Sequence, residues 1–377
     1  MAGNSIDIIP VATRSDQKAF LNLPWAIYRD DRNWIPPLRQ NQKELAGFAK
    51  HPFYNEAESK AFIAKKNGEV VGRILAITDH RFNRQNDTNF GMFGFFESID
   101  DAQVAEGLFD AVKAFHRAND REAIRGPVNP SMNYECGLLV DGFDSPPVFM
   151  MTYNRPYYET LFEQNGFEKG HDLYAYHGHV SQLEDNEKRW QFINERLNKK
   201  VNLNIRAMRR PDFDMELRQF LEIYNRALPG SWGFVPISEA EMEHMAKGLR
   251  HLIVPEITGV AEVDGQTVGV VFGMLDYNPR IKAIDGKLFP FGFLKLLWNK
   301  RKINRIRVIS ANVIPEFQVN KGIGLSLFAS LIPMIRDWGI EEVEFSWVLE
   351  SNRLSRATLE RCGTKLYKTY RMYDHQL

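Results

Sequence analysis

The chain has 377 residues, of which 44% are hydrophobic and 25% are charged, a balance typical of globular proteins with substantial buried cores. Lysine plus arginine and aspartate plus glutamate both number 48, so no global field attracts nucleic acid or an anionic membrane. The two cysteines lie far apart in the sequence with no C-x-x-C spacing, which argues against a disulfide framework or a zinc ribbon and favours a reducing, cytoplasmic location.

No segment is expected to cross a membrane. The N-terminus has no basic stretch leading into an apolar run, so we expect no signal peptide. The most apolar later run, LFPFGFLKLLW at 288–298, has about half the length that crosses a bilayer. A chain of this length suits two domains better than one.

The first clear elements along the chain form a β-hairpin over residues 63–79, IAKKNGEVVGRILAITD. Apolar, β-rich runs on both sides of Asn67-Gly68 are a strong short-range signal for two antiparallel strands. A helix is predicted at 108–120, and a short β-like segment then ends at Asn133. The turn-rich loop at 125–143 either lines an acceptor pocket or caps a sheet.

The second half repeats this order of elements. Its hairpin, VAEVDGQTVGVVFGMLD at 260–276, matches the first at an offset of 197 residues, with Asp264-Gly265 as the turn. The offset rises to 219 for the helix at 327–339, which places about 22 extra residues after the second hairpin. It returns to 197 near the C-terminus, where Gly363 matches Gly166.

We therefore predict an α/β (α+β) protein that contains the same fold twice, each copy with a mixed central sheet flanked by helices. The predicted division is a first domain at 1–180, a charged linking helix at 181–200 and a second domain at 201–377.

The extra residues include FPFGFLKLLWNKRK at 289–302, an aromatic and leucine-rich run with a basic end. We interpret it as a helix that covers the sheet and ends in a solvated basic turn. Its composition also fits a membrane-surface helix, or one wall of an apolar acyl or acceptor channel.

The stretch VIPEFQVNKGIGLSLFASLIPMIRDWG, at 313–339, leads from a predicted strand through Gly322 and Gly324 into an apolar-periodic helix. The first N–H groups of a helix have no intrahelical partner, and the helix dipole places partial positive charge there. Glycines let the backbone approach a phosphate closely, and Lys321 adds a positive charge. An ordinary tight strand-to-helix turn is the alternative explanation.

This arrangement resembles the signature of the GNAT superfamily, the GCN5-related N-acetyltransferases, in which a Q/R-x-x-G-x-G/A loop holds the pyrophosphate of acetyl-CoA. Asn352 and Gly363 match the spacing of the family motif N-x-x-A-x-x-L-Y-x-x-x-G. The segments DRNWIPPL, GLLVDGF, LFPFGFLKLLW, SWVLESN and YKTYRMY resemble an uncharacterised bacterial family of tandem GNAT proteins over nearly the whole chain.

Two positions depart from the superfamily pattern. The expected Gln or Arg falls at Val319, so we assign its role to Gln318 in a loop with one extra residue. The tyrosine that often protonates the departing CoA thiolate falls at Leu359, which has no proton to give. The terminal segment offers three tyrosines instead, of which we name Tyr370 as a candidate and keep Tyr367 and Tyr373 as alternatives.

The resemblance implies that acetyl-CoA is the co-substrate and that it binds to the second half. The implied cofactor-binding residues are Val313, Gln318, Lys321, Gly322, Ile323, Gly324, Leu325 and Asn352. Glu316 and Glu350, the carboxylates nearest to the inferred strand ends, are the candidates for the general base. No metal site is expected.

The first half lacks the phosphate loop. At the offset of 219, Gln103 and Ala105 replace the two glycines and Glu106 adds negative charge. We interpret this half as structural or substrate-shaping.

The favoured function is an acyl-CoA-dependent N-acyltransferase in which a small-molecule or peptide amine attacks the thioester directly. The alternatives are a non-catalytic protein that binds CoA or a metabolite, and a transferase of a longer acyl group. The sequence predicts no nucleic-acid partner, and it does not predict the acceptor or the oligomeric state.

Overall fold

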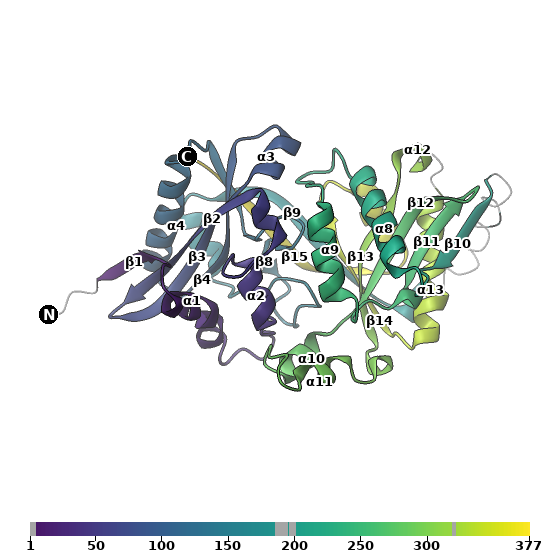
Figure 1. Ribbon diagram of the computed structural model, residues 1–377, viewed down its shortest axis with the longest axis horizontal. Helices are drawn as coiled ribbons and strands as arrows, with labels where there is room; N and C mark the ends of the chain where they lie inside the picture. Colours follow the sequence, from purple (N-terminus) through teal and green to yellow (C-terminus); the bar gives the residue numbers. More distant parts are fainter. Residues whose placement is uncertain (1–4, 185–194, 196–200, 319–321) are drawn as a thin grey trace. The chain divides into compact units, whose positions relative to one another are not determined.

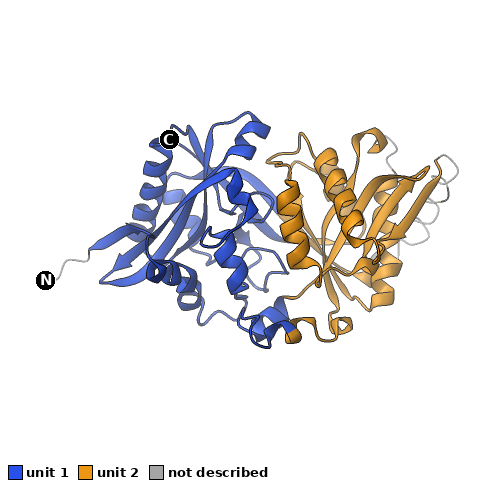
Figure 2. Cartoon of the chain, viewed as in Figure 1, with its two compact units in different colours: residues 1–173, 278–293, 368–377 blue, residues 174–277, 294–367 orange. Residues whose placement is uncertain are grey.

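The computed structural model describes residues 5–184, 195, 201–318 and 322–377. The chain forms two compact units that are interleaved in sequence (Figure 2). Unit 1 comprises Met1–Leu173, Asn278–Phe293 and Lys368–Leu377, and unit 2 comprises Tyr174–Tyr277 and Leu294–Tyr367. Of the predicted linking helix at 181–200, α6 (Val180–Glu184) covers the start, and most of the rest lies outside the described residues. The division at residues 180 and 201 remains a prediction.

The sheet of unit 1 is mixed (Figure 1). Its first four strands pair antiparallel in chain order, the fifth joins the fourth in parallel, and the end of β15 closes the series antiparallel to the fifth. A fragment, β8, also pairs with β15, and β6 with β7 forms a small second sheet. The strands are β1 (Ile6–Pro10), β2 (Ala57–Lys66), β3 (Glu69–Asp79), β4 (Phe90–Ser98), β5 (Ala123–Gly126), β6 (Val128–Asn129), β7 (Glu135–Cys136), β8 (Leu138–Asp141) and β15 (Lys365–Gln376).

Helices cover both faces of this sheet. Neighbouring residues of β3 point to opposite faces: Gly72 meets α4 at Leu108, whereas Arg73 donates to the backbone carbonyl of Phe20 in α1. The α4 face holds a cluster of aromatic rings around Phe109. The helices of the unit are α1 (Arg14–Ile27), α2 (Arg39–Leu45), α3 (His80–Asn86), α4 (Ala102–Arg117), α5 (Tyr158–Gln164) and α10 (Asn278–Ala283), with a 3₁₀ turn at Pro52–Asn55.

Unit 2 has the corresponding sheet. Its strand order is β9, β14, β13, β12, β11 and β10, and the β13–β14 pair is parallel. Helix α13 packs on one face, with Phe328 against Phe345, and α8 packs on the other, with Phe220 against Phe272. The elements are β9 (Glu168–His179), β10 (Leu203–Ala207), α8 (Phe213–Ala227), α9 (Glu239–Leu249), β11 (Thr258–Val263), β12 (Gln266–Leu275), α11 (Gly292–Leu297), β13 (Arg305–Val313), α12 (Pro315–Gln318), α13 (Ile323–Trp338), β14 (Glu342–Leu349) and α14 (Arg353–Arg361), with 3₁₀ turns at Pro255–Ile257 and Lys300–Lys302.

The internal repeat is visible in these elements. Both hairpin turns place two successive residues at positive φ, as the Asn-Gly and Asp-Gly pairs predict. The hairpins carry a β-bulge at the same place, between Ala64 and Lys65 in one and between Ala261 and Glu262 in the other. Leu108 packs against Gly72 as Leu327 packs against Gly269. The predicted fold, a mixed sheet with helices on its faces, is confirmed in both units.

The last strands of the two halves are exchanged between the units. The end of β9, which completes the first half of the sequence, lies beside β14 in unit 2. The end of β15, which completes the second half, pairs with β5 in unit 1. Each unit therefore needs a strand from the other half of the chain.

Segment 289–302 is not the sheet-covering helix that we expected. Only Gly292–Leu297 forms an α-helix, and Phe289 and Trp298 are 84% and 78% exposed. No helix within the described part of the chain combines the length and hydrophobicity that a bilayer crossing requires.

Candidate functional site

Strands β13 and β14 of unit 2 separate part of the way along. Their parallel pairing runs from Arg305 opposite Glu342 to Val308 opposite Phe345 and then stops, although β13 continues to Val313 and β14 to Leu349. Beyond Val308, β13 remains paired to β12 on its other side, with a register shift where Ile309 is skipped. The result is a fork, residues 309–313 and 346–349, between two strands that are otherwise neighbours.

Helix α13 begins close after this fork. Its N-cap is Gly322, which provides no side chain to bond the first N–H groups of the helix. Ile323 is fully buried and holds the first turn in place, whereas Gly324 is exposed. A Cβ on Gly324 would lie 3.8 Å from Cγ2 of Val313, an ordinary contact, so packing within the unit does not require glycine there.

The equivalent helix of unit 1 supplies its own anion. The N-cap of α4 is Asp101, whose carboxylate accepts from the N–H groups of Gln103 at 3.0 Å and Val104 at 3.4 Å. Lys66 donates to the same carboxylate at 2.6 Å and holds the pKa of Asp101 below its usual value. A negative group thus already occupies the helix start in unit 1.

The fork of unit 1 is also filled. Strands β4 and β5 pair only as far as Met92 and Arg125, and the chain after β5 then lies against β4. Val128 comes so close that a Cβ on Gly94 would lie 1.6 Å from its carbonyl oxygen. The N–H of Phe95 donates to Asn129 at 2.7 Å, and that of Ser98 donates to the Tyr158 hydroxyl at 2.9 Å. The loop at 125–143 therefore fills the position that corresponds to the unpaired ends of β13 and β14 in unit 2.

Most of the residues predicted to bind the co-substrate lie between the end of β13 and the first turn of α13. Gln318 donates from Nε2 to the carbonyl oxygen of Val313 at 2.7 Å, which ties α12 to the end of β13. Leu325 is half-buried in the first turn of α13, and Lys321 lies outside the described residues. Asn352 is exposed and is the N-cap of α14, where its Oδ1 accepts from the N–H of Ser355 at 3.1 Å. Their binding roles remain predictions.

The three predicted catalytic residues have different surroundings. Glu316 is exposed and pairs with Arg226 at 3.0 Å, and its own backbone N–H and that guanidinium hold the pKa of its carboxyl below the usual value. Glu350 is half-buried and directly follows β14. Tyr370 is fully buried and belongs to unit 1, whereas the fork belongs to unit 2.

A polar network at the base of the fork was missed from the sequence. The guanidinium of Arg307 donates from Nε to Oγ of Ser346 at 2.8 Å, and that hydroxyl donates to Oε1 of Glu344 at 2.6 Å. The Tyr367 hydroxyl donates to Oε2 of Glu344 and accepts from Nη2 of Arg305 at 3.2 Å. Glu344 is 0% exposed, so its carboxylate is held by buried hydrogen bonds.

A signal for this network does exist in the sequence. The runs RIRV and EVEF place two arginines and two glutamates at alternate positions of neighbouring strands, which puts all four on one face. That face is opposite to α13, because Phe345, the neighbour of Glu344, packs against the helix. The indole Nε1 of Trp347 on β14 is also buried, without a hydrogen-bond partner among the described residues.

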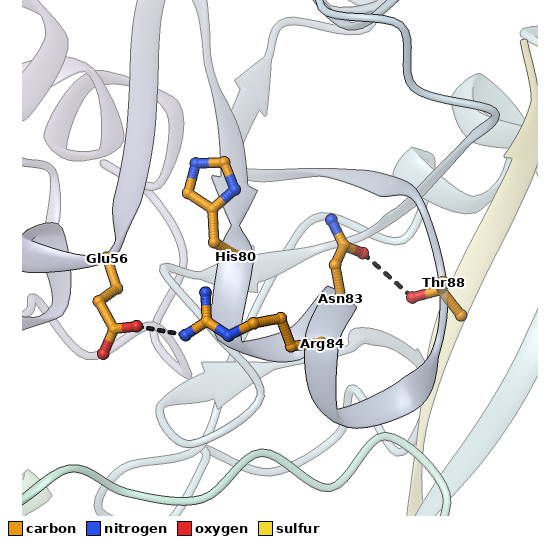
Figure 3. Close-up of a pocket in the computed structure, with 5 residues that line it drawn as sticks. All are labelled: Glu56, His80, Asn83, Arg84 and Thr88. Atoms are coloured by element: carbon orange, nitrogen blue, oxygen red, sulfur yellow. Dashed lines mark hydrogen bonds and ion pairs between the residues drawn. The ribbon is translucent and has the colours of Figure 1, made fainter.

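Unit 1 carries a hollow of about 410 Å³ at α3, lined by Glu56, His80, Asn83, Arg84 and Thr88 (Figure 3). Its polar side chains largely satisfy one another: Arg84 pairs with Glu56, and the Thr88 hydroxyl donates to Asn83 at 3.0 Å. None of the predicted site residues lines it. In the described ranges, no group of three or more His, Cys, Asp or Glu side chains is placed to hold a metal ion.

Two curated proteins match almost the whole chain. Protein YghO of Escherichia coli (strain K12) is 37% identical over 372 residues, which cover 97% of this chain and 94% of that protein. The bacterial ceramide synthase of Caulobacter vibrioides (strain NA1000 / CB15N) is 33% identical over 386 residues, which cover 99% and 98%. No family model matches the chain.

Solved structures share the fold at low identity. A tandem GNAT protein from the clavulanic acid biosynthesis pathway aligns with a TM-score of 0.56 and 12% identity, covering 99% of this chain and 98% of that one. A GCN5-related N-acetyltransferase from Sphaerobacter thermophilus aligns with a TM-score of 0.52 and 12% identity, covering 98% and 95%. The tandem GNAT fold that the sequence predicts is confirmed.

Proposed function

Because the chain belongs to the family of tandem GNAT-fold proteins that includes protein YghO and the bacterial ceramide synthase, we propose that it is an acyl-CoA-dependent N-acyltransferase with its site in unit 2. The observation that carries the proposal is the asymmetry between the repeats. In unit 2, β13 and β14 stop pairing at the fork and the N-cap of α13 is a glycine, whereas Asn129, Tyr158 and Asp101 bond to the corresponding backbone N–H groups in unit 1.

The pyrophosphate of acyl-CoA would lie on the N–H groups at the start of α13, where the helix dipole favours an anion and the N-cap Gly322 brings no side chain of its own. The pantetheine arm would continue along the fork, between residues 309–313 of β13 and 346–349 of β14. An arm that passes between the strands reaches the opposite face of the sheet, which carries Ser346 and Glu344. The Trp347 indole offers a further hydrogen-bond donor in the fork.

In the proposed reaction a neutral amine attacks the thioester carbonyl, a C–N bond forms, and the C–S bond breaks to release CoA. The amine must lose a proton, and Glu344 is the base that its bonding supports best. Oγ of Ser346 would take the proton of the amine as its own hydrogen moves to Oε1 of Glu344, 2.6 Å away. Glu316 suits this role less well, because its carboxylate is exposed and paired with Arg226.

The departing thiolate needs a proton, which Leu359 cannot supply. Of the three terminal tyrosines, Tyr367 is in unit 2 and bonds to Glu344, whereas Tyr370 and Tyr373 belong to unit 1. We therefore propose Tyr367 as the acid. Tyr370 and Glu350 remain the candidates against which Tyr367 and Glu344 are tested.

We propose a long acyl group and an amino-lipid acceptor. A ceramide is a fatty acid joined by an amide bond to a long-chain amino alcohol, and the relative named for making it aligns with this chain from end to end. The N-acetyltransferase structures are only 12% identical and support the fold alone, so they do not favour acetyl-CoA.

The test measures CoA release by the purified chain from acetyl-, octanoyl- and palmitoyl-CoA. Each is offered with a long-chain amino alcohol, a polyamine or a peptide amine, and the product is identified by mass spectrometry. The proposal expects release with a long acyl chain and the amino alcohol. Release confined to acetyl-CoA would refute the long-chain assignment. Tight CoA binding without release for any amine would favour the non-catalytic alternative.

A further inference from the structure

The segment 287–302, hereafter the aromatic-basic segment, places its large side chains in solvent. Eight large hydrophobic residues of the described chain are exposed, and five of them lie inside this segment, within the ten residues 289–298. Isolated exposed apolar residues are normal, but a contiguous cluster marks an interaction surface. The five are Phe289 at 84%, Phe291 at 67%, Phe293 at 42%, Leu294 at 51% and Trp298 at 78% exposed.

The segment is folded, so its outward side chains are held there. Leu296 is 4% exposed and anchors α11, and Ile284 is buried just before the segment. The N–H of Phe293 donates to the carbonyl of Leu288 at 2.9 Å, and that of Trp298 donates to Leu294 at 2.9 Å. The rings of Phe289 and Phe293 lie 6.5 Å apart. One side of α11 therefore packs inward while the aromatic residues face outward.

The positive charge of the segment indicates that its partner is negatively charged. Residues 287–302 contain five basic residues and no acidic residue, in a chain whose formal net charge is zero. Lys287 pairs with Asp285, just before the segment, with Nζ and Oδ2 3.2 Å apart, so the local positive charge beside the exposed aromatic cluster is that of the other four basic residues. The basic residues are Lys287, Lys295, Lys300, Arg301 and Lys302, of which all but Lys300 are exposed.

We propose that the aromatic-basic segment docks on the surface of an anionic phospholipid bilayer. Trp and Phe enter the boundary between headgroups and acyl chains, and lysine and arginine beside them meet the lipid phosphates. The six-residue α11 lies on the surface and does not span, in keeping with the absence of a bilayer-crossing helix among the described residues. This inference does not rest on the proposed reaction.

The experiment is cosedimentation of the full chain with vesicles of phosphatidylcholine, with and without phosphatidylglycerol. The chain should sediment with the anionic vesicles, bind pure phosphatidylcholine at least tenfold more weakly, and lose binding as salt is raised. A triple variant, Phe289→Ser, Phe291→Ser and Trp298→Ser, should lose binding more than tenfold. Lys295→Gln and Lys302→Gln should each weaken binding about fivefold.

The control is Met215→Ser with Leu354→Ser, which removes two exposed apolar residues elsewhere and should bind like the wild type. A second readout is tryptophan emission, which should shift to shorter wavelength with anionic vesicles and shift less in Trp298→Phe. If the wild type does not bind anionic vesicles, or if the control loses as much vesicle binding as the triple variant, the inference is wrong. It is also wrong if light scattering shows a dimer that the triple variant dissociates while vesicles have no effect, because the surface would then join two copies.

Discussion

Replacing Gly324 by alanine distinguishes a glycine that the fold requires from a glycine that ligand binding requires. The backbone at Gly324 does not have positive φ, and an added Cβ would meet nothing closer than Cγ2 of Val313 at 3.8 Å. Alanine should therefore be accommodated, and its higher helix propensity should leave the free energy of unfolding unchanged or raise it by up to about 1 kcal/mol.

Ligand binding should respond in the opposite direction. If a phosphate oxygen approaches the N–H groups at the start of α13, the new methyl group holds it away from the backbone. Loss of one hydrogen bond to a charged group is worth about 1.5–3 kcal/mol. The Kd for CoA should then rise roughly ten- to 150-fold. Calorimetric titration with CoA measures this directly, because CoA contains the pyrophosphate.

Gly248→Ala is the matched control, because Gly248 is a helical glycine of the same unit with nothing within 4 Å of an added Cβ. It should bind CoA like the wild type. Gln103→Val, at the equivalent position to Gly322 in unit 1, should do the same. The reasoning is refuted if Gly324→Ala binds CoA normally, or if either control weakens binding equally.

Four further predictions follow from the contacts. Glu344→Gln should lower turnover about 10²- to 10⁴-fold while the Kd for CoA stays within about twofold. Glu316→Gln should leave both turnover and the Kd nearly unchanged. If Glu316→Gln lost turnover and Glu344→Gln did not, Glu316 would be the base. Tyr367→Phe should lower turnover roughly tenfold or more, and normal turnover there with a loss in Tyr370→Phe would reassign the acid. A fragment of residues 200–377 lacks the β9 strand that lies beside β14, so it should aggregate or fail to turn over, and a soluble, fully active fragment would contradict this. Burial lowers the pKa of His116 from 6.5 to about 4, so the folded state binds fewer protons than the unfolded chain and stability falls as the pH drops from about 6.5 to 4. At about 1.36 kcal/mol per pH unit this loss reaches about 3 kcal/mol, and the urea midpoint of His116→Gln should lack that part of the pH dependence.

The repeats and the helix start could be predicted because their signals are local. Asn67-Gly68 and Asp264-Gly265 specify their turns by backbone conformation alone. Gly324 stands out because it lies inside the first turn of an apolar-periodic helix, where glycine is less favourable than alanine, and Gly322 stands at the N-cap beside it. The contrast with Gln103 and Ala105 predicts that only the second half binds phosphate, and the different pairing of the strands at the two forks is consistent with that prediction.

The strand exchange could not be predicted, because β9 and β15 occupy equivalent places in the repeat. A period-two pattern identifies a strand but not the edge on which it pairs. Glu344 lies inside β14, so a prediction based on carboxylates at strand ends does not reach it, although the alternating charges of RIRV and EVEF mark the face on which it lies. Segment 289–302 was misread because apolar composition does not say whether a side chain is buried.

Hydrogen exchange of the wild-type chain with and without CoA tests the central claim most directly, because it reports on each repeat separately. The account predicts slower exchange at the backbone amides of 309–313 and at the start of α13 from Gly322. It predicts no change at residues 94–105, where Asn129, Tyr158 and Asp101 already occupy the equivalent positions. Protection at 94–105, or none at the fork of unit 2, would contradict the claim that this protein binds acyl-CoA between β13 and β14.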